Sequence, residues 1–214
     1  NNINLTNEWV NYVFDFSLSA NDQTQLKIFF NHNITNGTLT DMYYIDDLMF
    51  LPAPCDEPVN ENCSNVVQDY NIISDWNCQQ NYGIETTVPS VLNPLISCDN
   101  RSENVGQYTD DGTEAYDAFI LNYGSIINLS SHNKLKFKLY SNSSIQVLAK
   151  LEGGSAIEKW SDFSTVNTWQ EFSYDFSDST DNENTTLVLF FNAGQNNGNP
   201  EDIYYIDELR WEEN

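Results

Sequence analysis

The chain has 214 residues, of which 40% are hydrophobic and 14% aromatic, and it carries a formal net charge of −24 with only 8 Lys and Arg together. Such a charge repels polyanions, so it argues against nucleic acid and against anionic membrane surfaces as partners. No apolar run approaches the ~18 residues of a membrane-spanning helix, so no membrane insertion is expected.

Residues 1–52 are predicted to form strands. Apolar side chains alternate with polar ones along residues 10–16, the period of a half-buried strand. Residues 26–30 and 43–51 are two further apolar strands. Three strands cannot close a sandwich, and no signal peptide precedes them. We therefore interpret residues 1–52 as the C-terminal part of an upstream β-sandwich module in a trimmed or mature fragment. Upstream polypeptide or a partner would complete that module.

Residues 53–65 are rich in proline and are predicted to be a linker, because proline fixes φ and removes a hydrogen-bond donor. The even cysteine count, without CxxC spacing, predicts disulfides in an oxidising compartment, and hence a secreted or outer cell-surface protein. Three pairings are possible, and we favour Cys55–Cys63 with Cys78–Cys98.

Residues 66–214 are predicted to form a complete module. Gly, Asn, Asp and Ser separate many short apolar runs, which is typical of an all-β, jelly-roll-like β-sandwich. The candidate strands are residues 66–73, 105–108, 115–123, 134–140, 145–151, 169–176, 187–191 and 204–211.

The two parts of the chain contain similar sequences, which form an internal repeat. Residues 7–50 align with residues 167–211 with one single-residue gap, which predicts a tandem repeat whose first copy is incomplete. Each copy carries an aspartate inside an apolar strand, Asp46 and Asp207. Burying an unpaired charge is costly, so a metal ion or a fixed hydrogen-bond donor is expected beside it.

No catalytic constellation is apparent. His32 and His132 lack a paired nucleophile, and Glu152 with Glu158 is only a weak match to a glycosidase pair. Trp76 and Trp160 are each predicted to lie in a loop among polar residues. An exposed tryptophan offers a flat apolar face to the C–H face of a sugar, while the alternative is that each ring caps the core.

Several motifs follow one order through the chain, at residues 75–82, 93–94, 100–110, 148–154, 167–169 and 204–207. In this order the sequence resembles the carbohydrate-binding β-sandwich modules of secreted, multimodular bacterial glycan-degrading and surface glycan-binding proteins, including the laminarinase-associated type. The resemblance covers residues 66–214 nearly end to end, and residues 1–52 resemble the last third of such a module.

The resemblance implies a structural calcium ion that joins the first strand to the last. Its ligands would be Asp207 with Asn71 and Asp69, where Asn71 stands at a position that is more often glutamate, and Asp46 would play the matching role upstream. The implied glycan-binding residues are Trp76, Gln79, Gln80, Tyr116, Glu152 and Trp160.

The leading hypothesis is thus a non-catalytic module that binds a polysaccharide, with a β-glucan such as laminarin as the implied ligand. One rival is a structural or adhesive stalk that spaces other domains or contacts proteins. Another is an accessory part of an enzyme whose catalytic domain lies upstream.

Overall fold

The computed structural model describes residues 26–28, 44–46, 48, 55, 57–59, 63–195 and 202–214. The chain divides into two compact units, Asn1–Pro54 and Cys55–Asn214. In the first unit, residues 26–28, 44–46 and 48 belong to no strand, in contrast to the strands predicted over 26–30 and 43–51. The alternating strand predicted at residues 10–16 lies outside the described residues, as does His32.

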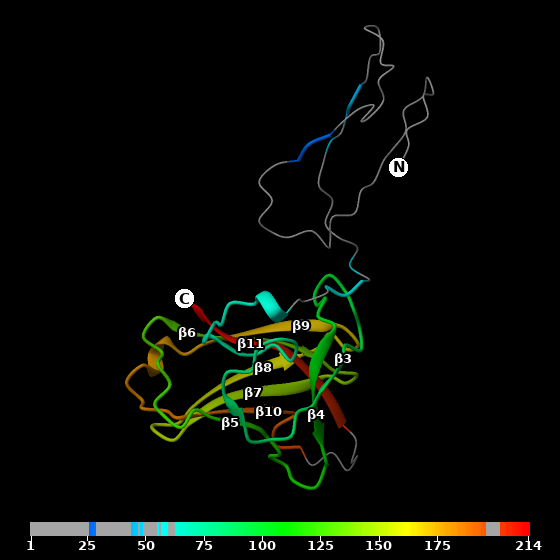
Figure 1. The fold of residues 1–214 in the computed structure, drawn as a ribbon. Helices are drawn as coiled ribbons and strands as arrows, with labels where there is room; N and C mark the ends of the chain where they lie inside the picture. Colours follow the sequence, from blue (N-terminus) through cyan, green and yellow to red (C-terminus); the bar gives the residue numbers. More distant parts are fainter. Residues whose placement is uncertain are drawn as a thin grey trace, which may run out of the picture. The chain divides into compact units, whose positions relative to one another are not determined.

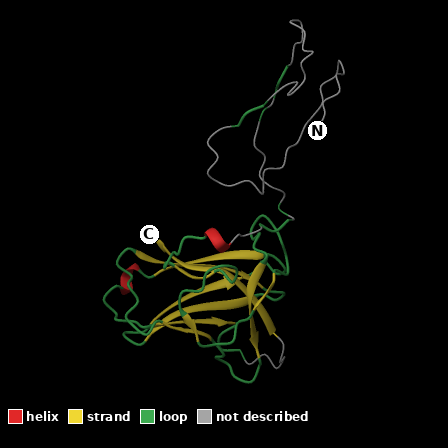
Figure 2. Ribbon diagram, in the orientation of Figure 1, coloured by secondary structure: helices red, strands yellow, loops and turns green. Residues whose placement is uncertain are grey.

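The second unit consists of two antiparallel sheets packed face to face (Figures 1 and 2). The first sheet has the order β3-β4-β11-β6-β9, and β1 also pairs with β11. Its strands are β1 (Ile72–Ser74), β3 (Ser90–Leu92), β4 (Asn104–Asp110), β6 (His132–Tyr140), β9 (Trp169–Asp175) and β11 (Asp202–Glu213).

The second sheet has the order β2-β5-β10-β7-β8. Its strands are β2 (Gly83–Ile84), β5 (Phe119–Asn122), β7 (Ile145–Glu152), β8 (Ile157–Phe163) and β10 (Thr186–Phe191). Two 3-10 helices, η1 (Cys63–Asn65) and η2 (Ser177–Ser179), are the helical elements of the described chain, and neither is long enough to cross a membrane. The prediction of an all-β sandwich is confirmed.

The core between the sheets consists of apolar side chains that alternate with polar ones along the strands. In β6, Leu135, Phe137 and Leu139 point inward and are fully buried, while the lysines between them point outward. Phe137 stacks on Phe172 of β9 with the ring centroids 5.3 Å apart. Each such side chain stabilises the fold by about 1.5–3 kcal/mol through burial, so the period-two pattern of the sequence fixes which face of each strand meets the other sheet.

The strand boundaries differ from the predicted ones, and β2, β3 and β8 were not predicted as strands. The strand predicted at 66–73 is present only as β1, since residues 66–71 form no strand. Residues 157–163 form β8, an edge strand, where the sequence indicated a loop around Trp160.

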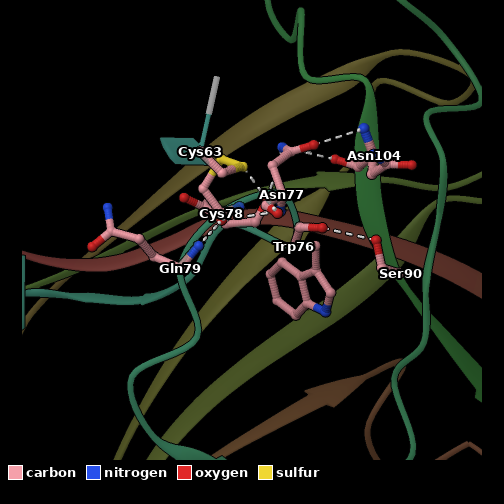
Figure 3. The surroundings of a disulfide bond; sticks show 8 residues. Cys63, Trp76, Asn77, Cys78, Gln79, Ser90 and Asn104 are labelled. Carbon is pink, nitrogen blue, oxygen red and sulfur yellow. Dashed lines mark hydrogen bonds between the residues drawn. A yellow bond between two sulfur atoms is a disulfide. The ribbon is translucent and has the colours of Figure 1, made fainter. Parts of the chain in front are cut away.

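The favoured disulfide pairing is wrong, because the bonds are Cys55–Cys98 and Cys63–Cys78. Figure 3 shows the second of these beside the turn at Trp76. The segment around Cys55 runs along the module, where the Val59 amide donates to the Arg101 carbonyl at 2.8 Å. The two bonds therefore fasten much of the predicted linker to the sandwich, and closing loops of these lengths contributes about 3–4 kcal/mol each.

Candidate functional site

The outer face of the second sheet carries a row of apolar side chains that we call the apolar row: Tyr116, Phe190, Leu148 and Trp160. Cross-strand pairing sets Trp160 of β8 opposite Leu148 of β7, and Leu148 opposite Phe190 of β10. Directly opposed residues of antiparallel strands share one face. Tyr116, from the loop between β4 and β5, meets the Phe190 ring edge-on at 6.2 Å. The row therefore crosses three strands, with an exposed ring at Trp160 (48% exposed) and another at Tyr116 (65%).

A buried apolar floor accompanies this row. Leu148 and Val188 are only 3% and 4% exposed, yet neither belongs to the core cluster between the sheets. Val188 is paired with Ile120 on one side and with Lys150 on the other. Since Leu148 and Val188 lie on the outward face, the side chains beside them on that face must cover them. The exposed rings of the apolar row thus lie on a buried apolar floor.

Charged groups line the row on one side. Lys150 is paired across the strands with Glu158, and its Nζ lies 2.6 Å from Glu152 Oε1 and 3.4 Å from Glu158 Oε1. The hydrogen bond to Glu152 raises the pKa of the Lys150 ammonium group, while burial acts in the opposite direction. These three side chains can donate to and accept from hydroxyl groups of a ligand on the apolar row.

Of the predicted glycan-binding residues, Tyr116, Glu152 and Trp160 come together on this face. Leu148, Val188, Lys150 and Phe190 were not predicted. Their sequence signal was present but ambiguous, because an uninterrupted apolar run such as residues 187–191 is typical of a strand buried on both faces.

Trp76 is not the exposed platform that the sequence suggested. It is only 8% exposed and belongs to the core cluster. Its indole Nε1 donates to the Val88 carbonyl at 3.3 Å, and its ring lies against Gly106, where a Cβ atom would come within 2.3 Å of it. Asp75 Oδ1 accepts hydrogen bonds from three consecutive backbone N–H groups, those of residues 77–79, which form a tight turn after Trp76. Trp76 therefore has the capping role that was the alternative.

The two predicted glutamines also lie away from the apolar row. Gln79 is buried, and its side-chain oxygen accepts a hydrogen bond from the Asp69 amide at 2.9 Å. Gln80 is exposed and forms an isolated bridge with Ser74, next to β1. Both belong to the turn that follows β1 rather than to the second sheet.

Asp207 is fully buried, and hydrogen-bond donors surround its carboxylate. Asn100 Nδ2 donates to Oδ2 at 2.8 Å, and the Glu208 amide donates to Oδ1 at 2.8 Å. Asn100 Oδ1 accepts from the Ser102 amide, which fixes the orientation of the Asn100 side chain. Burial raises the pKa of Asp207 to about 7. The fixed donor expected as one alternative is therefore present.

The other predicted calcium ligands do not gather around Asp207. Asp69 Oδ1 accepts from the Asn71 amide, and the Asn71 carbonyl accepts from the Trp211 amide at 2.8 Å. Trp211 lies four residues beyond Asp207 on β11, roughly 13 Å along a strand. Asp46, the proposed counterpart in the first unit, is exposed. The structure thus does not assemble the predicted site.

A different carboxylate cluster could hold a metal ion. Asp110, Asp111 and Asp117 bring one oxygen each to within 4.8 Å of one another. Burial raises the pKa of Asp117, and the charges of Asp111 and Asp110 act in the same direction. Asp117 Oδ2 is buried without a hydrogen-bond partner. The sequence offered no spacing that distinguished these three among the 32 acidic residues of the chain.

No protein-family model and no curated protein matches the sequence. Similar solved structures include an exo-β-agarase, at 11% identity over 67% of this chain and 24% of that chain, with a TM-score of 0.49. The family 11 carbohydrate-binding module of a cellulosomal cellulase of Clostridium thermocellum matches at 13% identity over 67% and 94%, with a TM-score of 0.44. SGBP-B from a xyloglucan utilization locus in Bacteroides uniformis matches at 13% over 67% and 50%, with a TM-score of 0.45. This chain spans about a quarter of the agarase chain, and the function proposed below rests on its own residues.

Proposed function

We propose that the chain is a non-catalytic glycan-binding module of a secreted or cell-surface protein, and that the outer face of the second sheet binds a polysaccharide. The observation that carries this proposal is the apolar row, where Trp160 and Tyr116 present exposed rings on one face of the second sheet. Phe190 and Trp160 stand on strands two places apart, about 10 Å, so the row is long enough to contact more than one sugar ring.

The chemistry of the face suits a sugar. Pyranose rings pack their C–H faces on aromatic side chains, and polar groups at the edge then bind the hydroxyl groups. Lys150, Glu152 and Glu158 supply those polar groups beside the row. Both carboxylates engage the same ammonium group, an arrangement that supports binding over hydrolysis. The two disulfides indicate an oxidising compartment, which supports a secreted or outer-surface location.

A β-glucan such as laminarin is the proposed ligand, supported by the order of motifs in which the sequence resembles laminarinase-associated modules. The proposed structural cation is calcium, a hard ion that prefers oxygen ligands. The carboxylates of Asp110, Asp111 and Asp117 fit it better than Asp207 does, because Asp117 has a buried oxygen without a donor.

Retention on polysaccharide gels tests the function. Trp160→Ala and Tyr116→Ala should each weaken retention on laminarin or mixed-linkage β-glucan about fivefold to tenfold, since a lost stacking platform removes roughly 1 kcal/mol or more. The matched control is Tyr70→Ala, which removes an exposed ring that is part of neither sheet. If the parent protein binds no glycan, the result favours a structural or adhesive stalk. If the parent binds and both variants bind as well as the parent, the assigned face is wrong.

A further inference from the structure

Beyond Trp160, where β7 begins and β8 and β10 end, the second sheet carries an open hollow of about 600 Å³, lined in part by the apolar residues Ile145, Phe163 and Ala193. Gln146 and Asp162 are paired across β7 and β8, two residues beyond the Leu148–Trp160 pair, so they lie roughly 7 Å further along the same face. The Asn192 amide donates to the Gln146 carbonyl at 2.8 Å. The polar residues that line the hollow are Ser144, Gln146, Asp162, Ser164, Asn192 and Gln195.

The lining is fixed in place. Gln146 Nε2 donates to Asp162 Oδ1 at 3.3 Å, and the Asp162 carbonyl accepts from Gln170 Nε2 at 3.1 Å. Asn192 has φ = +66°, in the left-handed region that asparagine tolerates, directly after β10 ends at Phe191. The hollow is thus held by strand pairing and side-chain bonds, with Trp160 beside it.

The functional groups of the lining match a neutral, hydroxyl-rich ligand. Three side-chain amides and two hydroxyls offer both donors and acceptors, the inventory that sugar hydroxyls need. Among the described lining residues, the one charged side chain is Asp162, which is an anion. A uronate carboxylate or a sulfate ester would meet that charge without a basic residue to offset it.

The charge of the neighbouring surface also disfavours an anionic ligand. Lys150, the cation beside the apolar row, is engaged by Glu152 and Glu158, so this group of three carries one net negative charge. The whole chain carries −24. Close like charges are strongly unfavourable where solvent is partly excluded.

We propose that this hollow is a specificity subsite for an uncharged sugar unit, adjacent to the stacking platform of Trp160, and that the face selects against uronate and sulfated polysaccharides. This inference rests on the proposed function, and it assigns the class of ligand and the residues that recognise it. Gln146 and Asp162 bind hydroxyl groups of the sugar, while Trp160 contacts its apolar face or that of the next unit.

Binding of residues 1–214 is measured by affinity electrophoresis and calorimetry. The uncharged polymers are laminarin, mixed-linkage β-glucan and agarose, and the anionic polymers are polygalacturonate, alginate and carrageenan. Binding to at least one uncharged polymer is expected, with no retention on the anionic ones. That binding should change less than twofold between 50 and 500 mM salt, because an uncharged ligand is insensitive to screening. Gln146→Ala and Asp162→Asn should each weaken it about fivefold, the effect of one lost hydrogen bond. Ser173→Ala, on an exposed position of the other sheet, is the control.

The outcomes separate the two proposals. Binding that Trp160→Ala weakens but Gln146→Ala and Asp162→Asn leave unchanged overturns the subsite and leaves glycan binding intact. Equal retention on the anionic polymers overturns the selectivity. An absence of binding to every polymer tested overturns both the subsite and the proposed function. Circular dichroism and the melting temperature verify that each variant is folded.

Discussion

The buried carboxyl group of Asp207 should make the folded state less stable as the pH rises, and Asp207→Asn should remove that dependence. Burial raises the pKa of Asp207 from its ordinary value of 3.8 to about 7. Between these pH values the folded state keeps a proton that the unfolded chain has released. At about 1.4 kcal/mol per pH unit, the effect amounts to about 4 kcal/mol over this range.

The sign follows from the direction of the pKa change. Below about pH 4 both states are protonated, and the stabilising contribution of the neutral group is fully present. It falls as the pH rises towards 7 and stays constant above that, once both states are ionised. Urea unfolding of the parent and of Asp207→Asn at several pH values isolates this group, because the other titrating groups largely cancel in the difference. The relative stability of the parent should decrease by up to about 1.4 kcal/mol per unit between pH 4 and 7.

The same experiment distinguishes the donor cage from a calcium site. A cation at Asp207 would favour the ionised form, so the relative stability of the parent would then rise with pH and respond to chelator. A difference that is independent of pH would refute the reasoning from burial. Asp175→Asn provides a control of opposite sign, because hydrogen bonds from Ser177 lower the pKa of that exposed carboxyl group.

Three further predictions concern stability. Replacing Cys63 and Cys78 together by serine should lower the free energy of unfolding by about 3 kcal/mol, as expected for a loop of 15 residues; unchanged urea unfolding under non-reducing conditions would contradict this bond. Gly106→Ala should cost about 1–3 kcal/mol, because its Cβ would lie 2.3 Å from a buried indole ring. Gly83→Ala, with open space around it, should stay within about 0.5 kcal/mol of the parent. Calcium should raise the melting temperature of the parent but not of Asp117→Asn, and equal responses would exclude the carboxylate cluster as the calcium site.

The sequence predicted the fold where one face of a strand is buried. Residues 134–140 alternate strictly, and they form β6 in the middle of a sheet. Residues 157–163 were missed because their large apolar side chains, Ile157, Trp160 and Phe163, stand three apart, which is not a strand period. An edge strand needs only one partner, and β8 obtains it from β7. The structure of β8 is therefore determined by its pairing with β7 and not by the local pattern of apolar residues.

The site was harder to predict than the fold. Trp76 and Trp160 look alike in their local polar surroundings, but Trp76 lies against Gly106, thirty residues along the chain, while Trp160 stands on an exposed strand face. Leu148 and Val188 looked like core residues, and only the register of three strands shows that they face outward. Such contacts are long-range, so no short window of sequence contains them.

The topology gives the internal repeat a physical meaning. Residues 7–50 match the stretch that forms β9, β10 and β11, and these strands are never neighbours: β9 pairs with β6, β10 lies between β5 and β7, and β11 lies between β4 and β6. The match includes no counterpart of those partner strands. Since backbone groups of a strand require partners, the interpretation of residues 1–52 as part of a separate module stays a prediction. Residues 55–214 alone should then melt within about 2 °C of the full chain, and a larger loss would show that the two units depend on each other.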